Sequence, residues 1–202
     1  VAACTAGQIE SVRFLLARGA ELRPKEAVVT PVQAAVMNGH VLVVKTLLEA
    51  FVRVSHAIVV FPGGVGTAEE ILYLLGILLH PDNAAQPFPL ILTGPRQSAE
   101  YFERIDAFLR LALGDAVASR YQILVDSPQQ VARAVRKGIE QVREYRVASQ
   151  DAFFFNWALR VPLDFQRPFH PDHQTMAALN LQRDQPAHRL AAPARSRPSR
   201  PG

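Results

Sequence analysis

The chain has 202 residues, of which 49% are hydrophobic and 20% are charged, and this balance is typical of a globular protein of one or two domains. Its formal net charge of +4 is concentrated in residues 183–202, where five arginines accompany a single aspartate, so the other 17 basic and 17 acidic residues cancel. The folded part therefore lacks the strong positive field that specific DNA or RNA binding needs.

Cysteine content and hydropathy indicate the compartment. Cys4 is the single cysteine, which excludes an internal disulfide and fits a reducing environment. The longest apolar run, residues 71–79, is interrupted by Gly76 and is far shorter than the roughly 20 residues that span a bilayer. The chain does not open with a charged and then apolar leader. We therefore expect a cytoplasmic protein with no membrane partner.

The first region, residues 1–48, contains two similar stretches. Gly7 and Gly39 mark equivalent positions 32 residues apart, and residues 30–35, Thr-Pro-Val-Gln-Ala-Ala, open the second stretch. This period and opening resemble the ankyrin repeat, which has a period of about 33 residues. The resemblance implies paired helices and a surface for a protein partner. The alternative is two amphipathic helices that are alike by chance, because such patterns are weak in one sequence.

The second region, residues 49–147, alternates apolar strands with helices. We expect strands over residues 57–61, 89–93 and 121–125, and helices over residues 67–79, 98–113 and 128–144. Ser98, and Asp126 or Ser127, are candidate caps for the last two helices, with Pro128 in the first turn of the third. Continuous apolar strands between helices are typical of a parallel sheet covered on both faces. The expected fold class is α/β with a Rossmann-like sheet.

The most informative stretch directly follows the first expected strand. It reads Pro-Gly-Gly-Val-Gly-Thr-Ala-Glu-Glu over residues 62–70 and opens a long apolar helix. Glycines let a ligand approach the backbone closely. At a helix N-terminus, free N–H groups and the positive end of the helix dipole point the same way, which favours an anion. A phosphate fits such a loop, and the adjacent carboxylates indicate chemistry on the phosphorylated molecule.

This string resembles the signature of the LOG ("lonely guy") family. Its members are phosphoribohydrolases that cut the N-glycosidic bond of nucleoside 5′-monophosphates such as AMP. Residues 49–53, 72–78, 90–95 and 155–157 are similar to the larger bacterial branch, the pyrimidine/purine nucleotide 5′-monophosphate nucleosidases. The resemblance covers about residues 48–190. It implies a nucleotide substrate, release of free base and ribose 5-phosphate, and a homo-oligomer, with no metal and no cofactor.

The resemblance also assigns roles to residues. Glu70 matches the acid taken as catalytic, and Glu69 matches with a less certain role. A carboxylate can stabilise the positive charge that develops on the sugar. We expect Thr67 to donate its amide N–H and its hydroxyl to a phosphate oxygen, with Glu70 about one helical turn further on. The plain alternative is that these acids merely suit a first helical turn. The phosphate-binding positions are Gly63, Gly64, Val65, Gly66 and Thr67.

Two arginines are further candidates for nucleotide contact. Arg96 follows the second expected strand, although a loop arginine is commonly just solvated. Arg53 is the arginine nearest to the place, close to Leu47, where family members carry an upstream arginine that works with the glutamate. It matches a different family position. The sequence His-Pro-Asp-His over residues 170–173 lacks a third ligand nearby, so we expect no metal site there.

The sequence departs from the family pattern at the upstream arginine, and it also lacks the first half of the family's sheet. These two departures determine the domain organisation that we expect. We interpret residues 1–48 as ankyrin-like helices and 49–147 as a partial LOG-type core. Residues 148–182 read as a docking segment or the start of the C-terminal nucleosidase domain, and 183–202 as a disordered basic tail. The alternatives to an enzyme are an inactive nucleotide-binding or ankyrin-type interaction module and a non-functional fragment of a fused reading frame.

Overall fold

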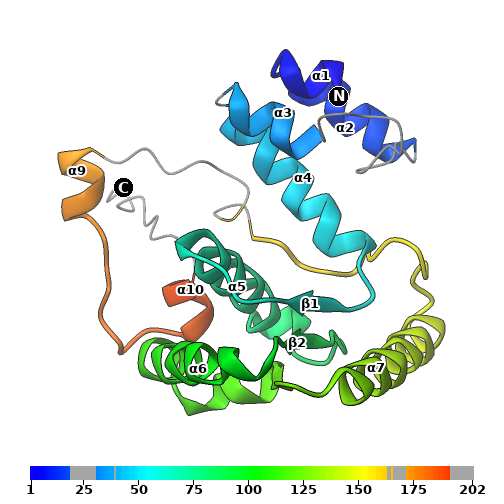
Figure 1. The fold of residues 1–202 in the computed structure, drawn as a ribbon. Helices are drawn as coiled ribbons and strands as arrows, with labels where there is room; N and C mark the ends of the chain where they lie inside the picture. Colours follow the sequence, from blue (N-terminus) through cyan, green and yellow to red (C-terminus); the bar gives the residue numbers. More distant parts are fainter. Residues whose placement is uncertain (19–30, 39, 163–164, 166–171, 192–202) are drawn as a thin grey trace. The chain divides into compact units, whose positions relative to one another are not determined.

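The chain forms two compact units. One comprises residues 1–54 and 161–170, and the other comprises residues 55–160 and 171–202. A computed structural model describes residues 1–18, 31–38, 40–162, 165 and 172–191, and Figure 1 shows its elements along the chain. Each unit is built around its own elements, so each is described in turn.

The first unit consists of two helical hairpins. The helices are α1 (Ala2–Thr5), α2 (Ile9–Ala17), α3 (Pro31–Met37) and α4 (Val41–Val54). Helix α1 packs on α3 and α2 packs on α4, so the hairpins stack. Gly7 joins the first two helices at a φ of +68°, and a methyl group there would lie 2.6 Å from Nδ1 of His40. This arrangement is compatible with the ankyrin-like interpretation, which stays a prediction. The buried core residues are Cys4, Val12, Ala34, Ala35, Val43 and Leu47.

The second unit contains a parallel sheet of three strands in the order β1-β2-β3, which confirms the predicted α/β class. The strands are β1 (Ile58–Val60), β2 (Leu90–Leu92) and β3 (Gln122–Ile123). Each strand is shorter than predicted, because the residues that flank it make only single backbone hydrogen bonds to the neighbouring strand. Thr93 N–H donates to the Val60 carbonyl, and Leu124 N–H donates to the Leu92 carbonyl, each at 2.9 Å.

The three predicted helices of this unit are confirmed. They are α5 (Val65–Leu78), α6 (Ala99–Leu113) and α7 (Pro128–Ala148). Ser98 and Ser127 occupy the N-cap positions of α6 and α7, but neither side chain makes a capping hydrogen bond. Pro128 stands in the first turn of α7 as predicted. Short 3-10 helices, not predicted, are η1 (Pro81–Asn83), η2 (Arg96–Ser98) and η3 (Asp115–Arg120).

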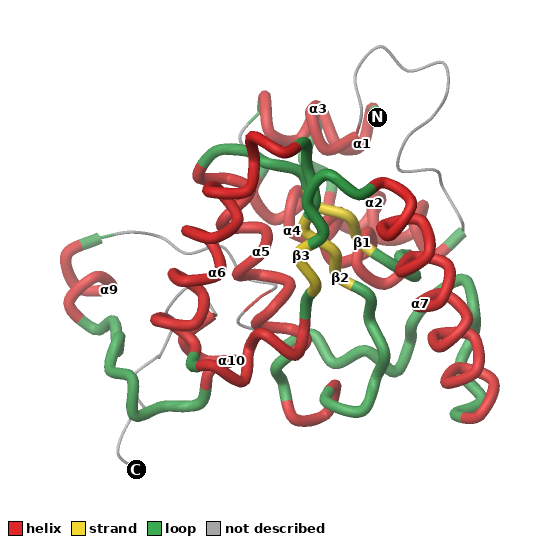
Figure 2. Tube along the Cα trace, turned by 60° about the horizontal axis from the view of Figure 1, so that its bottom comes forward, coloured by secondary structure: helices red, strands yellow, loops and turns green. Residues whose placement is uncertain are grey.

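The core of the second unit surrounds β2 and α5. All three residues of β2 are buried, and most of α5 from Ile71 onward is buried too. Helices α6 and α7 lie on opposite sides of the strands in both views (Figures 1 and 2). A methyl group on Gly138 of α7 would lie 2.2 Å from Cγ of Pro89, so this helix approaches the start of β2 closely. In the described ranges, no helix has both the length and the apolar character needed to cross a membrane.

The chain after α7 is tied to this core by buried polar groups. The Asn83 side-chain amide donates to the Arg160 carbonyl at 2.7 Å, and that of Asn156 donates to Gln86 at 3.0 Å. The guanidinium of Arg146, itself buried, donates to the carbonyls of Ala152 and Phe153. These bonds hold residues 152–160 against the rest of the second unit, and both interpretations of residues 148–182 stay predictions.

Two short helices follow, α9 (His173–Ala177) and α10 (Ala187–Ala191). The predicted disorder of residues 183–202 is wrong for α10, which packs against α5 and α6 with Ala191 buried. The overall composition of residues 183–202 is that of a disordered segment, and it does not reveal that α10 contains alanine and leucine side chains that can be buried. Residues 192–202 lie outside the described residues. The rings of His80 and His188 meet edge to face at 5.2 Å, and burial lowers the pKa of His188.

Candidate functional site

The predicted sequence of strand, glycine loop and helix N-terminus is present in the second unit. Strand β1 ends at Val60, and α5 begins at Val65 with Gly64 as its N-cap residue in an extended conformation. The loop glycines and the first two residues of α5 are exposed. Within the described part of the chain, no acceptor takes the amide N–H of Val65 or Gly66. These first-turn donors are therefore open to an anion.

Thr67 lies over Gly63. A methyl group on Gly63 would lie 2.0 Å from the hydroxyl oxygen of Thr67, so only glycine leaves room for this side chain. The amide N–H of Thr67 donates to the Gly64 carbonyl at 3.1 Å, within the first turn of the helix. This amide is therefore engaged within the helix, and its donation to a phosphate stays a prediction. The hydroxyl of Thr67 is the group that we expect this residue to donate to a phosphate.

Glu69 and Glu70 both lie early in α5, and both are exposed. Glu70 follows Thr67 by three residues, which places the two on neighbouring positions of the same helix face. Neither carboxylate has an ion-pair partner among the described residues. The structure therefore keeps the predicted acids on the helix that carries the predicted phosphate loop. Their catalytic role stays a prediction.

The loops after the three strands meet at the carboxyl edge of the sheet. A methyl group on Gly94, which follows β2, would lie 3.0 Å from the ring of Pro62 in the loop after β1. Asp126, which follows β3, donates its N–H to the Gly94 carbonyl at 2.9 Å and has a φ of +56°. Ligands of open α/β sheets bind at this edge. Sequence reasoning did not place Gly94 and Asp126 beside the glycine loop, although their positions just after two predicted strands were a usable signal.

The two candidate arginines differ in their settings. Arg96 opens η2, in the loop after β2, and is exposed. Arg53 belongs to α4 of the other unit, where its guanidinium pairs with Glu49 at 2.9 Å. Nucleotide contact by either residue stays a prediction. In the described ranges, no three His, Cys, Asp or Glu side chains gather in a way that could hold a metal ion. His170 lies outside those ranges.

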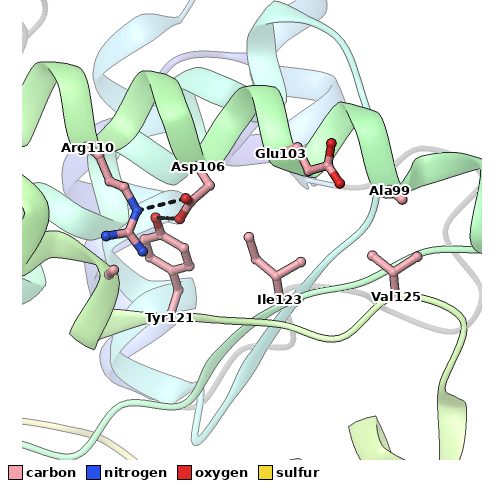
Figure 3. Close-up of a pocket in the computed structure, with 8 residues that line it drawn as sticks. Ala99, Glu103, Asp106, Arg110, Tyr121, Ile123 and Val125 are labelled. Carbon is pink, nitrogen blue, oxygen red and sulfur yellow. Dashed lines mark hydrogen bonds and ion pairs between the residues drawn. The ribbon is translucent and has the colours of Figure 1, made fainter.

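A groove lies between α6 and β3, and Figure 3 shows the side chains that line it. None of the described residues that line it belongs to the glycine loop. The hydroxyl of Tyr121 donates to Asp106 at 2.6 Å, and the Arg110 guanidinium donates to the same carboxylate at 2.7 Å. The hydrogen bond from Tyr121 lowers the pKa of Asp106, and burial raises the pKa of Tyr121. Since these groups satisfy one another, the groove is a less suitable reaction site than the open loop.

Comparison with known proteins identifies the family. Residues 25–135, more than half of the chain, match the family model described as "Possible lysine decarboxylase", the LOG family of the sequence analysis. The chain belongs to this family. Residues 139–199 match a second model, described as "Pyrimidine/purine nucleotide monophosphate nucleosidase, C-terminal". The LOG match begins well before residue 48, so it includes α3 and α4 of the region predicted to be ankyrin-like.

Individual relatives agree with the family. The chain is 52% identical over 145 residues to proteins of Escherichia coli strains K12 and O157:H7, each named pyrimidine/purine nucleotide 5′-monophosphate nucleosidase. The similar stretch is 72% of this LOG-family chain and 32% of each relative. The chain thus spans about a third of the length of the curated relatives it matches.

Proposed function

We propose that the chain carries the phosphate-binding loop and the catalytic carboxylate of a nucleoside 5′-monophosphate nucleosidase. In this reaction water adds to the anomeric carbon of the sugar as the N-glycosidic bond breaks, which yields free base and ribose 5-phosphate. One observation carries the proposal: the first turn of α5 leaves the amides of Val65 and Gly66 open and bears the Thr67 hydroxyl, with Glu70 one turn further on. The names of the relatives, pyrimidine/purine nucleotide 5′-monophosphate nucleosidase, support the choice of substrate.

Each group has a physical role in this proposal. The two amides, the hydroxyl and the positive end of α5 bind the doubly charged 5′-phosphate. Glu70 stabilises the positive charge that builds on the ribosyl ring, and it orients the attacking water. Glu69 adds a second negative charge on the same turn. The 5′-phosphate anchors the substrate so that its sugar lies within reach of the acid.

The test is base release by the purified chain. AMP, GMP, CMP and UMP are incubated with it, and free base is separated by chromatography. Glu70→Gln removes the negative charge but keeps the shape, so we expect the rate to fall by about 100-fold or more, the size of effect that single electrostatic contacts have on catalysis. Glu100→Gln is the control, because Glu100 is also exposed and early in a helix, α6, where it pairs with Arg104 at the surface. Release by Glu70→Gln at the full rate, or no release from any nucleotide by the wild-type chain, contradicts the proposal.

A catalytically inactive nucleotide-binding or interaction module is the second candidate. The observation that favours it is at Leu47, close to where the family carries its upstream arginine, because this apolar residue is buried in the helical core. Calorimetry with AMP separates the two candidates. Heat of binding without base release favours the inactive module, and binding with release favours the enzyme.

The proposal includes a homo-oligomer in the cytoplasm, as the family resemblance implies. The stacked helices of the first unit are the part of the chain proposed to engage a protein partner. Light scattering of the purified chain checks the assembly, and a monomeric mass at all concentrations contradicts it.

A further inference from the structure

A second pocket in the sheet-containing unit gathers positive charge without a matching acid. It lies at the amino end of the strands, between the segment leading into β2, the start of β3 and the first half of α7. Among the described residues that line it, three are cations and none is Asp or Glu. Glutamine side chains add neutral polar groups. The polar lining residues are Gln86, Ser119, Arg120, Tyr121, Gln122, Arg133, Lys137 and Gln141.

Arg120 is a partly buried cation that has no counter-ion among the described residues. One guanidinium nitrogen, Nη1, donates to the Ala84 carbonyl at 3.2 Å. The other, Nη2, is buried and has no hydrogen-bond partner among the described residues. Burial lowers the pKa of Arg120, and no neighbouring acid raises it. An unpaired buried cation is costly, and such a group commonly marks the place of an ion that completes the site.

Two further cations stand on one face of α7. Arg133 and Lys137 are four residues apart, which makes them neighbours on the helix surface, and both are exposed. Neither forms an ion pair within the described part of the chain. The adjacent Gly138 lies against Pro89, so this face of the helix is held close to the start of β2. The cations are therefore placed by packing rather than by attraction to an acid.

We propose that this pocket binds a small phosphate-bearing anion. Arginine offers a planar set of donors that matches phosphate oxygens, and lysine adds a point charge. Three cations call for a ligand with at least two negative charges. The pocket has a volume of about 460 Å³, within the range of small-molecule sites. The site is independent of the proposed nucleosidase reaction, because the glycine loop follows the carboxyl end of β1, at the opposite edge of the sheet.

Titration of inorganic pyrophosphate into the full chain by calorimetry tests the site. Arg133→Gln and Lys137→Gln each remove one charge from the exposed surface of α7. We expect each to weaken binding by about tenfold, the effect of losing one charge-assisted contact. Arg136→Gln is the matched control, because Arg136 is exposed on the same helix but does not line the pocket. Equal weakening by all three changes, or by none, overturns the proposal.

Two further measurements separate this pocket from the glycine loop and from misfolding. Thr67→Val alters the loop, so pyrophosphate binding that survives Thr67→Val and is lost in Arg133→Gln belongs to the pocket. At saturating pyrophosphate we expect the melting temperature of the wild-type chain to rise by about 5 °C. Arg120→Gln should keep the helical circular dichroism spectrum and lose this rise. A folded Arg120→Gln chain that pyrophosphate stabilises fully would overturn the assignment.

Discussion

Two glycines of the same loop differ in what a methyl group would meet. At Gly63 it would lie 2.0 Å from the Thr67 hydroxyl oxygen, whereas at Gly66 nothing lies within 4 Å. Gly63→Ala therefore forces Thr67 to move, and we expect it to lower the free energy of unfolding by about 1–3 kcal/mol. Gly66→Ala, in the first turn of α5, should leave this energy unchanged or raise it slightly. Urea denaturation measures both, and equal stabilities would contradict the close contact.

The bond between Tyr121 and Asp106 gives a pH-dependent prediction. The pKa of Asp106 is lowered in the folded chain, chiefly by the Tyr121 hydroxyl. Its contribution to stability is therefore full above the ordinary carboxyl pKa of about 4 and is lost as the pH falls through the lowered value. We expect Tyr121→Phe to cost about 1–2 kcal/mol at pH 7 and clearly less near pH 3. Urea denaturation at both pH values provides the measurement.

The control for this change is Tyr145→Phe. Tyr145 lies on α7, and its hydroxyl makes no hydrogen bond to the described residues. This change should have little effect at either pH. A cost for Tyr121→Phe that is the same at pH 7 and pH 3 would show that the charge of Asp106 plays no part in the bond.

At the scale of the elements, α7 depends on a glycine that helix propensity alone would disfavour. Gly138 is buried in the middle of this helix, and a methyl group there would lie 2.2 Å from Pro89. In an open helix Gly→Ala gains up to about 1 kcal/mol. Here we expect Gly138→Ala to lose about 1–3 kcal/mol, because packing outweighs propensity. Thermal and urea denaturation check the sign, and partial rescue by Pro89→Gly would identify the contact.

The strands and long helices of the second unit were predictable, because their signals are local. A continuous apolar run followed by a helical pattern is legible within some 20 residues, as for β1 and α5. The packing of residues 151–160 could not be predicted from local signals, because it depends on Asn83 and Gln86, more than 70 residues away. The same holds for α10, whose packing on α5 and α6 the composition of the tail does not reveal.

The candidate site was likewise predictable only where its signals are local in the sequence. Its loop and acids form one contiguous string, so they were found, together with the family. Gly94 and Asp126 were not placed beside the loop, because the sheet, not the chain, brings them to it. The sequence did not reveal that the amide of Thr67 donates within the first turn of α5. The basic pocket escaped notice because its cations are spread over residues 120–137 and meet only through folding.

At the scale of the whole molecule, the two units carry separate natural probes. The chain has one cysteine, Cys4, buried in the helical unit, and one tryptophan, Trp157, beside Phe155 in the other unit. The helical core is small and contains two alanines, so it buries little apolar area. We expect Cys4 to react with a thiol reagent at lower urea than the concentration at which Trp157 fluorescence changes. Coincident transitions would show that the units unfold together.

Each outer strand of the sheet is paired on one side only, in the described part of the chain. The unpaired edges of β1 and β3 offer backbone N–H and C=O groups to any extended segment that approaches, including one from another molecule. We therefore expect the chain to aggregate in concentrated solution and to stay unaggregated in dilute solution.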